Sequence, residues 1–319
     1  MTPTSNGSRY VVNILVTGAD GFVGSRLVPR LAGEGHRIRA LVRTGAKRRP
    51  VGVEVAELEL RDQASVSAGV AGGWDAVVHL AAVASGVEAR RDPGHAWEIN
   101  AAGSARLCEA VAEGRLEGKD PLLLLISTAE VYGAGRAQPR RETDLPVPCS
   151  PYAASKLAAE VAAFEVARRR GLRVVVARPF PHTGAGQDDR FVVPAFARRL
   201  RDASRAGARE VPVGNLTPVR DILHVEDVVD AYVLLLSRGR PGTVYNVASG
   251  EGISIEMVFR KLADLMSVAV KPRPDPALVR EADIPHLVGD AGRLRQETGW
   301  VPRRTLDEAL GEVVRAEAH

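Results

Sequence analysis

A short apolar run that leads directly into a glycine-rich turn restricts this chain to few folds. Residues 11–16 (VVNILV) are mostly apolar, which is expected of a strand covered on both faces of a sheet. The turn 17–24 (TGADGFVG) follows at once, and residues 25–31 predict a helix that Pro29 should break or distort. A strand, a glycine-rich turn and a helix in this order are typical of an α/β protein that binds a dinucleotide.

The three glycines of the turn each suit a pyrophosphate-binding loop. Gly18 permits the tight turn, Gly21 lets backbone N–H groups approach a pyrophosphate, and Gly24 allows the helix to pack closely on the strand. The N-terminus of the helix adds partial positive charge for the phosphates. The alternative is an ordinary glycine-rich turn that binds no ligand.

Further apolar runs at regular intervals predict a parallel sheet. The expected strands are 37–42, 53–58, 75–80, 121–127 and 172–177. Helical patterns separate several of them, including 95–114, which predicts one long helix that contains Asn100. This alternation predicts an α/β fold with a doubly wound parallel sheet.

The chain changes character after residue 178, where a long irregular stretch begins. The later part should form helices at 191–200, 254–266 and 306–314 and a strand at 242–247. We therefore expect a cofactor-binding domain over residues 10–178, to which about 219–250 returns. Residues 179–319 should then form mainly a smaller, mostly helical substrate-binding region.

Tyr152 and Lys156 form a second notable feature, on a predicted helix. Ser150 is a good N-cap and Pro151 suits the first helical position, so the helix should start there. Residues at i and i+4 lie one above the other on one helix face. A cation beside a tyrosine favours phenolate and lowers its pKa, so the pair suits acid–base chemistry. The alternative is a tyrosine and a lysine on an ordinary amphipathic helix.

The composition excludes several other classes of protein. The net charge is only +4, and aromatic residues make up 4% of the chain, so a stacking platform for nucleic acid is not expected. The two cysteines, Cys108 and Cys149, form no metal-binding motif, and we expect both to be reduced in a cytoplasmic protein. The apolar runs are too short to span a membrane.

The glycine spacing of TGADGFVG resembles the signature of the extended short-chain dehydrogenase/reductases, a Rossmann-fold family. In that family a Ser or Thr upstream completes a triad with Tyr and Lys, and the segment 127–133 (STAEVYG) matches it through Thr128. The resemblance implies an enzyme that binds NAD or NADP, works on nucleotide sugars and uses Thr128, Tyr152 and Lys156 as its catalytic triad.

The expected cofactor site includes a basic cluster. An acidic residue after the second strand would favour NAD, but this chain has Arg43 there, followed by Lys47, Arg48 and Arg49. Guanidinium groups suit the 2′-phosphate of NADP, so NADP(H) is favoured and NAD(H) stays possible. The alternative is a solvated basic loop.

Other cofactor contacts come from the turn and from the ends of later strands. We expect Phe22, Val23, Leu80, Ala81 and Ala82 to contact the cofactor together with Tyr152 and Lys156. The family often places an acidic residue at the position of Asp62 against adenine, although a helix cap explains Asp62 nearly as well. His79 lies within an apolar strand, so we expect a packed histidine with hydrogen-bond partners.

The second half resembles the GDP-4-keto-6-deoxy-D-mannose reductase group, with GDP-mannose 4,6-dehydratases as near relatives. The matching segments include 178–187 (RPFPHTGAGQ), 191–200 (FVVPAFARRL) and 280–287 (READIPHL). The resemblance implies substrate contacts from Ser85, Thr128, Val193, Arg220, Arg280 and Asp283. A surface ion pair with Asp221 is the alternative for Arg220. Pro181 and Ala185 depart from the group, which has Asn and Pro at these positions.

The function implied is NADPH-dependent reduction of a nucleotide-linked 4-keto-6-deoxy sugar in deoxysugar biosynthesis, with the proton given by Tyr152. A 4,6-dehydratase is the main alternative, because dehydratases use a Glu at the position of Glu130; a polar wall residue is the other interpretation of Glu130. A 4-epimerase and a non-catalytic NADP-binding protein are weaker alternatives. Analogy with the family suggests a homodimer.

Overall fold

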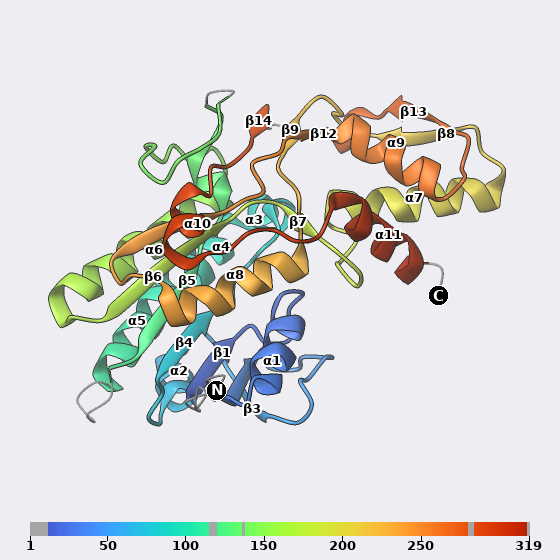
Figure 1. Ribbon diagram of the computed structural model, residues 1–319. Coiled ribbons are helices and arrows are strands. Elements are labelled where there is room, and N and C mark those ends of the chain that lie inside the picture. Colours follow the sequence, from blue (N-terminus) through green and yellow to red (C-terminus); the bar gives the residue numbers. More distant parts are fainter. Residues whose placement is uncertain (1–11, 115–119, 136–137, 280–283, 318–319) are drawn as a thin grey trace, which may run out of the picture.

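A seven-stranded parallel sheet forms the centre of the computed structural model, which describes residues 12–114, 120–135, 138–279 and 284–317 (Figure 1). The strands run in the order β11-β6-β5-β4-β1-β2-β3, and neighbours pair in parallel throughout. Their bounds are β1 Asn13–Thr17, β2 Arg37–Val42, β3 Glu54–Glu57, β4 Ala76–His79, β5 Leu122–Ile126, β6 Arg173–Pro179 and β11 Thr243–Val247. The predicted doubly wound α/β fold is confirmed.

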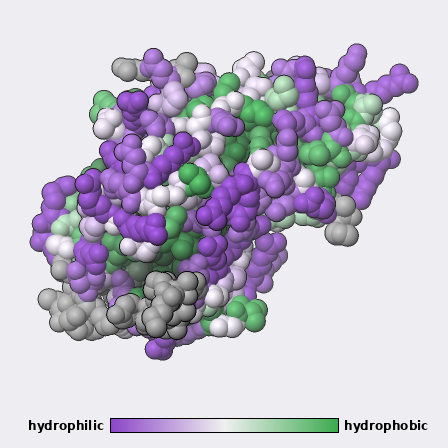
Figure 2. Space-filling model, in the orientation of Figure 1, coloured by the Kyte–Doolittle hydropathy of each residue, from purple (hydrophilic) through white to green (hydrophobic). Residues whose placement is uncertain are grey.

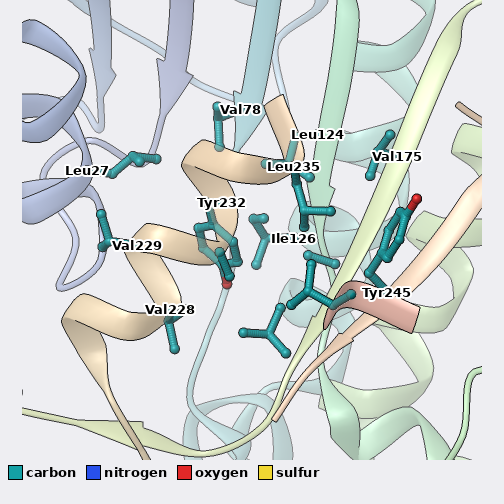
Figure 3. Close-up of a cluster of buried hydrophobic side chains, with 14 of the residues drawn as sticks. Leu27, Val78, Leu124, Ile126, Val175, Val228, Val229, Tyr232, Leu235 and Tyr245 are labelled. Atoms are coloured by element: carbon teal, nitrogen blue, oxygen red, sulfur yellow. The ribbon is translucent and has the colours of Figure 1, made fainter. Parts of the chain in front are cut away.

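Helices cover both faces of this sheet. One face packs against α1 (Gly24–Gly33), α8 (Val225–Arg238) and α10 (Gly292–Thr298). The other face packs against α2 (Gln63–Val70), α5 (Ser104–Glu113) and α6 (Pro151–Arg170). Burial on both faces explains why the strand sequences are apolar without alternation. Figure 3 shows the core on the α8 side, where the Tyr232 side chain approaches Ile126 of β5 and the Val229 side chain faces Leu27 of α1.

A smaller region lies beyond the carboxyl ends of the strands (Figure 1). Its separate core joins α7 (Val192–Ala206), α9 (Ile255–Leu265) and α11 (Leu306–Glu317). Short strands add to it and connect it to the main sheet. These are β7 His182–Thr183, β8 Glu210–Val213, β9 Val219–Arg220, β10 Leu223–His224, β12 Ile253–Ser254, β13 Lys271–Pro274 and β14 His286–Leu287. The region is therefore mostly helical, as expected, with small sheets that the sequence analysis did not predict.

Two predictions about helices were wrong in detail. The expected helix 95–114 is divided into α4 (Pro93–Trp97), a π-helix (Glu98–Gly103) and α5, with α3 (Gly86–Arg91) before it. The widened turn contains Asn100, whose side chain binds backbone outside the helix. The second concerns Pro29, which lies inside α1: the expected break is wrong, while the alternative, a distortion of the helix, stays a prediction.

Two further helices in the described part of the chain are 3₁₀ segments at Ala129–Tyr132 and Pro276–Leu278. Most of the surface visible in Figure 2 is hydrophilic, with hydrophobic residues in smaller groups between. Among the helices that the structure describes, none is long and apolar enough to cross a membrane.

Candidate active site

A cleft of about 1800 Å³ lies where the carboxyl ends of the strands meet the smaller region. The glycine-rich turn, the residues after β2, β4, β5 and β6, the start of α6 and the first turns of α7 line it. Ligands of doubly wound sheets bind at this edge because the loops there diverge to either face. The cleft therefore has the position expected for a nucleotide.

The glycine-rich turn has no room for a side chain at Gly18 or at Gly24. Gly18 has a φ of +66°, and a Cβ there would lie 2.7 Å from the Ala81 backbone nitrogen. A Cβ on Gly24 would lie 2.4 Å from the Gly18 carbonyl oxygen. Phe22 and Val23 line the cleft between these glycines, and α1 begins at Gly24. The turn thus fits a pyrophosphate held against backbone N–H groups and the start of a helix.

Leu80, Ala81 and Ala82 line the cleft after β4, as predicted. The Thr17 side chain fixes this segment, because its hydroxyl accepts from the Ala81 backbone N–H at 3.1 Å. The same hydroxyl lies 2.8 Å from Nδ1 of His79, whose Nε2 lies 2.9 Å from the Ser104 hydroxyl. His79 is fully buried and its pKa falls to about 3 because burial disfavours the charged ring. The prediction of a packed, satisfied histidine is confirmed.

Thr128, Tyr152 and Lys156 all line one end of the cleft. Thr128 follows β5 and caps the 3₁₀ turn, where its hydroxyl accepts from the Glu130 N–H at 3.2 Å. The α6 helix starts as predicted, because the Ser150 hydroxyl accepts from the Ala153 N–H at 3.1 Å and Pro151 opens the first turn. The structure thus brings together three residues that lie up to 28 positions apart in the chain (156 minus 128).

The Tyr152 phenol differs from the sequence-based prediction. Burial raises its pKa, the Glu130 carboxylate raises it further, and the neighbouring Thr128 hydroxyl acts in the opposite direction. The expected lowering of this pKa is therefore wrong for the protein alone, because burial and the Glu130 carboxylate both disfavour the phenolate. Tyr152 is consequently a protonated phenol at neutral pH, which is the form that can donate a proton.

Lys156 is almost completely buried, at 3% exposure. Burial lowers its pKa from the usual value to about 8, and the Glu160 carboxylate one turn further along α6 opposes this shift. Lys156 therefore keeps a positive charge at neutral pH in a poorly hydrated place. A cation there attracts the electron-rich oxygens of a ligand more strongly than it would in water.

Asn100 is a residue of the site whose role the sequence analysis did not identify. Its side-chain oxygen accepts from the Val83 N–H at 2.8 Å, and its amide donates to the Val83 carbonyl at 3.1 Å and to the Ser155 hydroxyl at 3.0 Å. These bonds hold the segment after β4 against α6, beside Tyr152 and Lys156. The only signal in the sequence is a polar amide within an otherwise buried helix face.

The basic cluster follows β2, three strands from β5 and Thr128 in the sheet. Arg43, Lys47 and Arg48 line the cleft, whereas Arg49 is not among the lining residues of the described chain and pairs with Glu57. Arg43 is exposed, and its guanidinium lies 3.3 Å from the Asp20 carboxylate. A flexible, exposed guanidinium can turn from this partner to a phosphate.

Asp62 and Ser85 have structural roles in this protein. Asp62 caps α2, where its carboxylate accepts from the Ala64 N–H at 3.0 Å, and Ser85 caps α3 through the Glu88 N–H at 3.3 Å. Neither is among the residues that line the cleft in the described part of the chain. For Asp62 the structure thus supports the capping interpretation, and the sugar contact of Ser85 stays a prediction.

The predicted substrate residues are only partly described by the structure. Val193 is buried at the start of α7 and lines the cleft, as does Arg220 on β9. Arg220 donates to the Ile284 carbonyl at 2.6 Å. Its alternative role was wrong, because Asp221 is buried and its carboxylate binds Ser249 and the N–H groups of Gly250 and Gly289. Arg280 and Asp283 lie outside the described residues.

Comparison with known protein families gives one match that covers most of the chain. Residues 14–248 match the model of the NAD dependent epimerase/dehydratase family. The chain belongs to this family. Membership confirms the resemblance to the extended short-chain dehydrogenase/reductases and makes the chain an NAD(P)-dependent enzyme of the nucleotide-sugar kind.

Two relatives of the family are similar to this chain over nearly its whole length. GDP-6-deoxy-D-mannose reductase from Pseudomonas aeruginosa is 38% identical over 308 residues, which cover 94% of this chain and 95% of the relative. A UDP-glucose 4-epimerase from Azospirillum brasilense is 31% identical over 95% of this chain and 90% of the relative.

Two solved structures of family members carry a nicotinamide cofactor. The Pseudomonas aeruginosa RMD structure in complex with NADPH has a TM-score of 0.83 and 35% identity, covering 96% of this chain and 98% of that chain. The Thermus thermophilus UDP-glucose 4-epimerase structure in complex with NAD has a TM-score of 0.85 and 31% identity, covering 95% of this chain and 98% of that chain. Family members thus bind either cofactor, in agreement with the prediction that favoured NADP(H) and allowed NAD(H).

Among the described residues, no group of three His, Cys, Asp or Glu side chains could hold a metal ion. Cys108 is buried and Cys149 is exposed, and both are free thiols. The predicted catalytic residues Thr128, Glu130, Tyr152 and Lys156 all line the cleft, and their roles stay a prediction.

Proposed function

We propose that this chain is an NADPH-dependent reductase of a nucleotide-linked 4-keto-6-deoxy sugar of the GDP-4-keto-6-deoxy-D-mannose type. The observation that carries this proposal is the arrangement of one cleft. The pyrophosphate turn follows β1 and the basic cluster follows β2, whereas Thr128 follows β5, three strands from β2, and all of them line the same cleft as Tyr152 and Lys156. A relative with the name of this reductase is similar over nearly the whole chain.

The cofactor would bind across this cleft from the basic cluster to Lys156. Arg43, Lys47 and Arg48 would bind the 2′-phosphate, and the turn from Gly18 to Gly24 would bind the pyrophosphate. Bound NADPH supplies the hydride for the sugar carbonyl carbon. Lys156 would then donate to the ribose hydroxyls beside the nicotinamide.

The reacting end of the cleft provides the proton. Thr128 and Tyr152 would both donate hydrogen bonds to the keto oxygen, which orients the sugar and stabilises the negative charge that develops there. Tyr152 then gives its proton to that oxygen. Its raised pKa keeps the phenol protonated before the reaction, and the Lys156 charge stabilises the phenolate that is left.

The nucleotide would lie against the smaller region. Val193 and Arg220 line that side of the cleft, and Arg220 suits a diphosphate or ribose. Residues Arg280 and Asp283 are proposed to contact the ribose and the base. Pro181 has no side-chain amide and no N–H, so the nucleotide contacts on that loop must differ from those of the reductase group.

A 4,6-dehydratase is the second candidate, and one observation favours it. Glu130 lines the cleft close enough to Tyr152 for its charge to raise the pKa of the phenol. A carboxylate in that place could remove or return a proton next to the keto carbon. A dehydratase returns its hydride within each cycle and consumes no reductant, as does a 4-epimerase.

Cofactor consumption separates these activities. The purified protein with GDP-4-keto-6-deoxy-D-mannose should oxidise one NADPH for each sugar reduced, followed by absorbance and by product analysis. Conversion of GDP-mannose without added reductant would instead identify the dehydratase. NADPH binding without turnover of either sugar, or of the corresponding UDP- and dTDP-sugars, would contradict both and leave a non-catalytic binding protein.

The assembly and location of the chain are also proposals. Analogy with the family suggests a cytoplasmic homodimer. Light scattering of the purified protein at several concentrations measures the assembly directly. A single species with the mass of one chain would contradict the homodimer.

A further inference from the structure

Tyr232 has a buried hydroxyl that the proposed reaction does not use. The residue lies on α8, and its side chain is completely buried. Its hydroxyl has no hydrogen-bond partner among the described residues. A buried polar group without a partner lowers folding stability, so such a group calls for a functional explanation.

The ring of Tyr232 is held by the core of the protein. Figure 3 shows it reaching from α8 toward Ile126 at the end of β5, with Val228 and Val229 on the same helix. All four residues belong to one hydrophobic cluster. Packing of this kind fixes the ring, and therefore fixes the place of the hydroxyl.

Tyr232 lies at the border between this core and the cleft. Tyr232 is one of the cleft-lining residues, together with Ile126, Thr128 and Pro179. Its phenol is close enough to Tyr152 to interact electrostatically with it, and burial and Tyr152 both raise the pKa of Tyr232. Tyr232 is thus a protonated hydrogen-bond donor that the core holds in place near Tyr152, in the lining of the cleft.

The ligand group expected at this place is the nicotinamide. The pyrophosphate turn and Lys156 fix the two ends of the path that the cofactor follows, and the nicotinamide occupies the end near Tyr152. The only uncharged hydrogen-bonding group on that ring is its carboxamide. A hydroxyl of a cleft-lining residue near Tyr152 is therefore suited to bind the carboxamide.

We propose that the Tyr232 hydroxyl donates a hydrogen bond to the carboxamide oxygen of the nicotinamide and so fixes the rotation of that ring. A nicotinamide ring held by its carboxamide presents one fixed face to Tyr152 and the keto sugar. The geometry of hydride transfer would then not depend on the substrate. The cost of the unpartnered hydroxyl in the free protein is recovered when the cofactor binds.

The inference rests on the proposed binding of NADPH in the cleft, and affinities of the free protein test the two separately. Binding of NADPH is compared with binding of 2′-phospho-ADP-ribose, which lacks the nicotinamide, and with reduced 3-acetylpyridine–NADP, which keeps the carbonyl but replaces the amide NH₂. Tyr232→Phe should raise the Kd for NADPH and for the acetyl analogue by about 3- to 10-fold, as expected for one hydrogen bond. The Kd for 2′-phospho-ADP-ribose should not change.

Tyr245→Phe is the matched control. Tyr245 is a buried tyrosine of the same cluster, but its hydroxyl accepts from the Arg240 N–H at 3.0 Å and also binds Glu297. This variant should lower the melting temperature of the free protein and leave all three affinities unchanged. Tyr232→Phe should leave that melting temperature equal or higher, because it removes a hydroxyl without a partner.

Each other outcome has a defined meaning. An equal loss of affinity for all three ligands, or a fall in melting temperature like that of Tyr245→Phe, would show a structural role for Tyr232 and overturn the inference. A loss for NADPH without a loss for the acetyl analogue would show that the hydroxyl accepts from the amide, which contradicts donation to the oxygen. Wild-type protein that binds no NADPH would refute the proposed function itself.

Discussion

Arg178 and Glu160 form a buried, two-point ion pair, and Glu160 lies one helical turn after Lys156 on α6. The Arg178 guanidinium donates to the two Glu160 oxygens at 3.0 and 2.7 Å, and both side chains are about 5% exposed or less. Glu160 also accepts from the Ser127 hydroxyl, next to Thr128, while Arg178 donates to the Tyr132 hydroxyl at 3.0 Å. The pair therefore joins α6, which carries Tyr152 and Lys156, to β5 and β6.

Removing one partner of this pair should destabilise the protein strongly. Glu160→Gln leaves the Arg178 guanidinium buried without a counter-charge, which should lower the free energy of unfolding by about 3–5 kcal/mol. Urea unfolding at pH 7 measures it. Glu165→Gln on the same helix is the matched control, because Glu165 pairs with Arg169 at the surface and its loss should change little. Similar stabilities for the two variants would contradict a structural role for the buried pair.

Tyr152→Phe should abolish most of the turnover. The variant cannot donate the proton, and a positioned general acid contributes about 10²–10⁴-fold to a rate. The ring stays in place, so NADPH affinity, measured by fluorescence titration, should be close to that of the wild type. Turnover near the wild-type rate in a correctly folded Tyr152→Phe protein would refute the role of Tyr152.

The sequence predicted those parts of the site that depend on local geometry. The turn at Gly18 and Gly24 follows from steric limits that only glycine meets, and Tyr152 and Lys156 follow from the spacing of one helix. Thr128 became recognisable only through its family segment. Its meeting with Tyr152 depends on the order of strands in the sheet, which no local pattern contains.

Features that depend on burial or distant contacts could not be predicted in this way. Asn100 binds Val83 and Ser155, which are 17 and 55 positions away. Asp62 was ambiguous because the residue types that cap helices are also those that bind ligands. The predicted lowering of the Tyr152 pKa was wrong, because a sequence shows a neighbouring lysine but not the loss of hydration on burial.

Cofactor preference should depend on Arg43 and not on Arg49. Arg43 lines the cleft beside the glycine-rich turn, whereas Arg49 pairs with Glu57 outside the lining residues described here. Arg43→Ala should weaken NADPH binding by about 5- to 30-fold, equivalent to about 1–2 kcal/mol for one charge-assisted contact at an exposed site. NADH binding should not change, because NADH lacks the 2′-phosphate. Equal effects of Arg43→Ala and Arg49→Ala would indicate a general charge effect instead.

NADPH binding should weaken as the pH rises through about 8, since Lys156 loses its charge there. The lysine pKa is about 8 in the folded protein and about 10.4 when exposed. Below pH 8 the free protein carries the charged ammonium that the ligand oxygens need. Above it, binding must first return a proton to Lys156, so the Kd rises by up to about tenfold for each pH unit.

The lowered pKa of Lys156 also affects stability, in the opposite direction: NADPH binding should weaken as the pH rises, whereas the free energy of unfolding should increase. These two opposite pH dependences together identify Lys156 as the titrating group. Between about pH 8 and 10.4 the unfolded chain holds more protons on Lys156 than the folded one, so its contribution to the free energy of unfolding rises with pH in that window. Lys156→Met should bind NADPH more weakly at pH 7 and should lose both pH dependences. Titrations and urea unfolding from pH 6.5 to 10 measure them. An inflection near pH 8 that persists in Lys156→Met would assign the titration to another group, because the substituted side chain carries no proton that could leave.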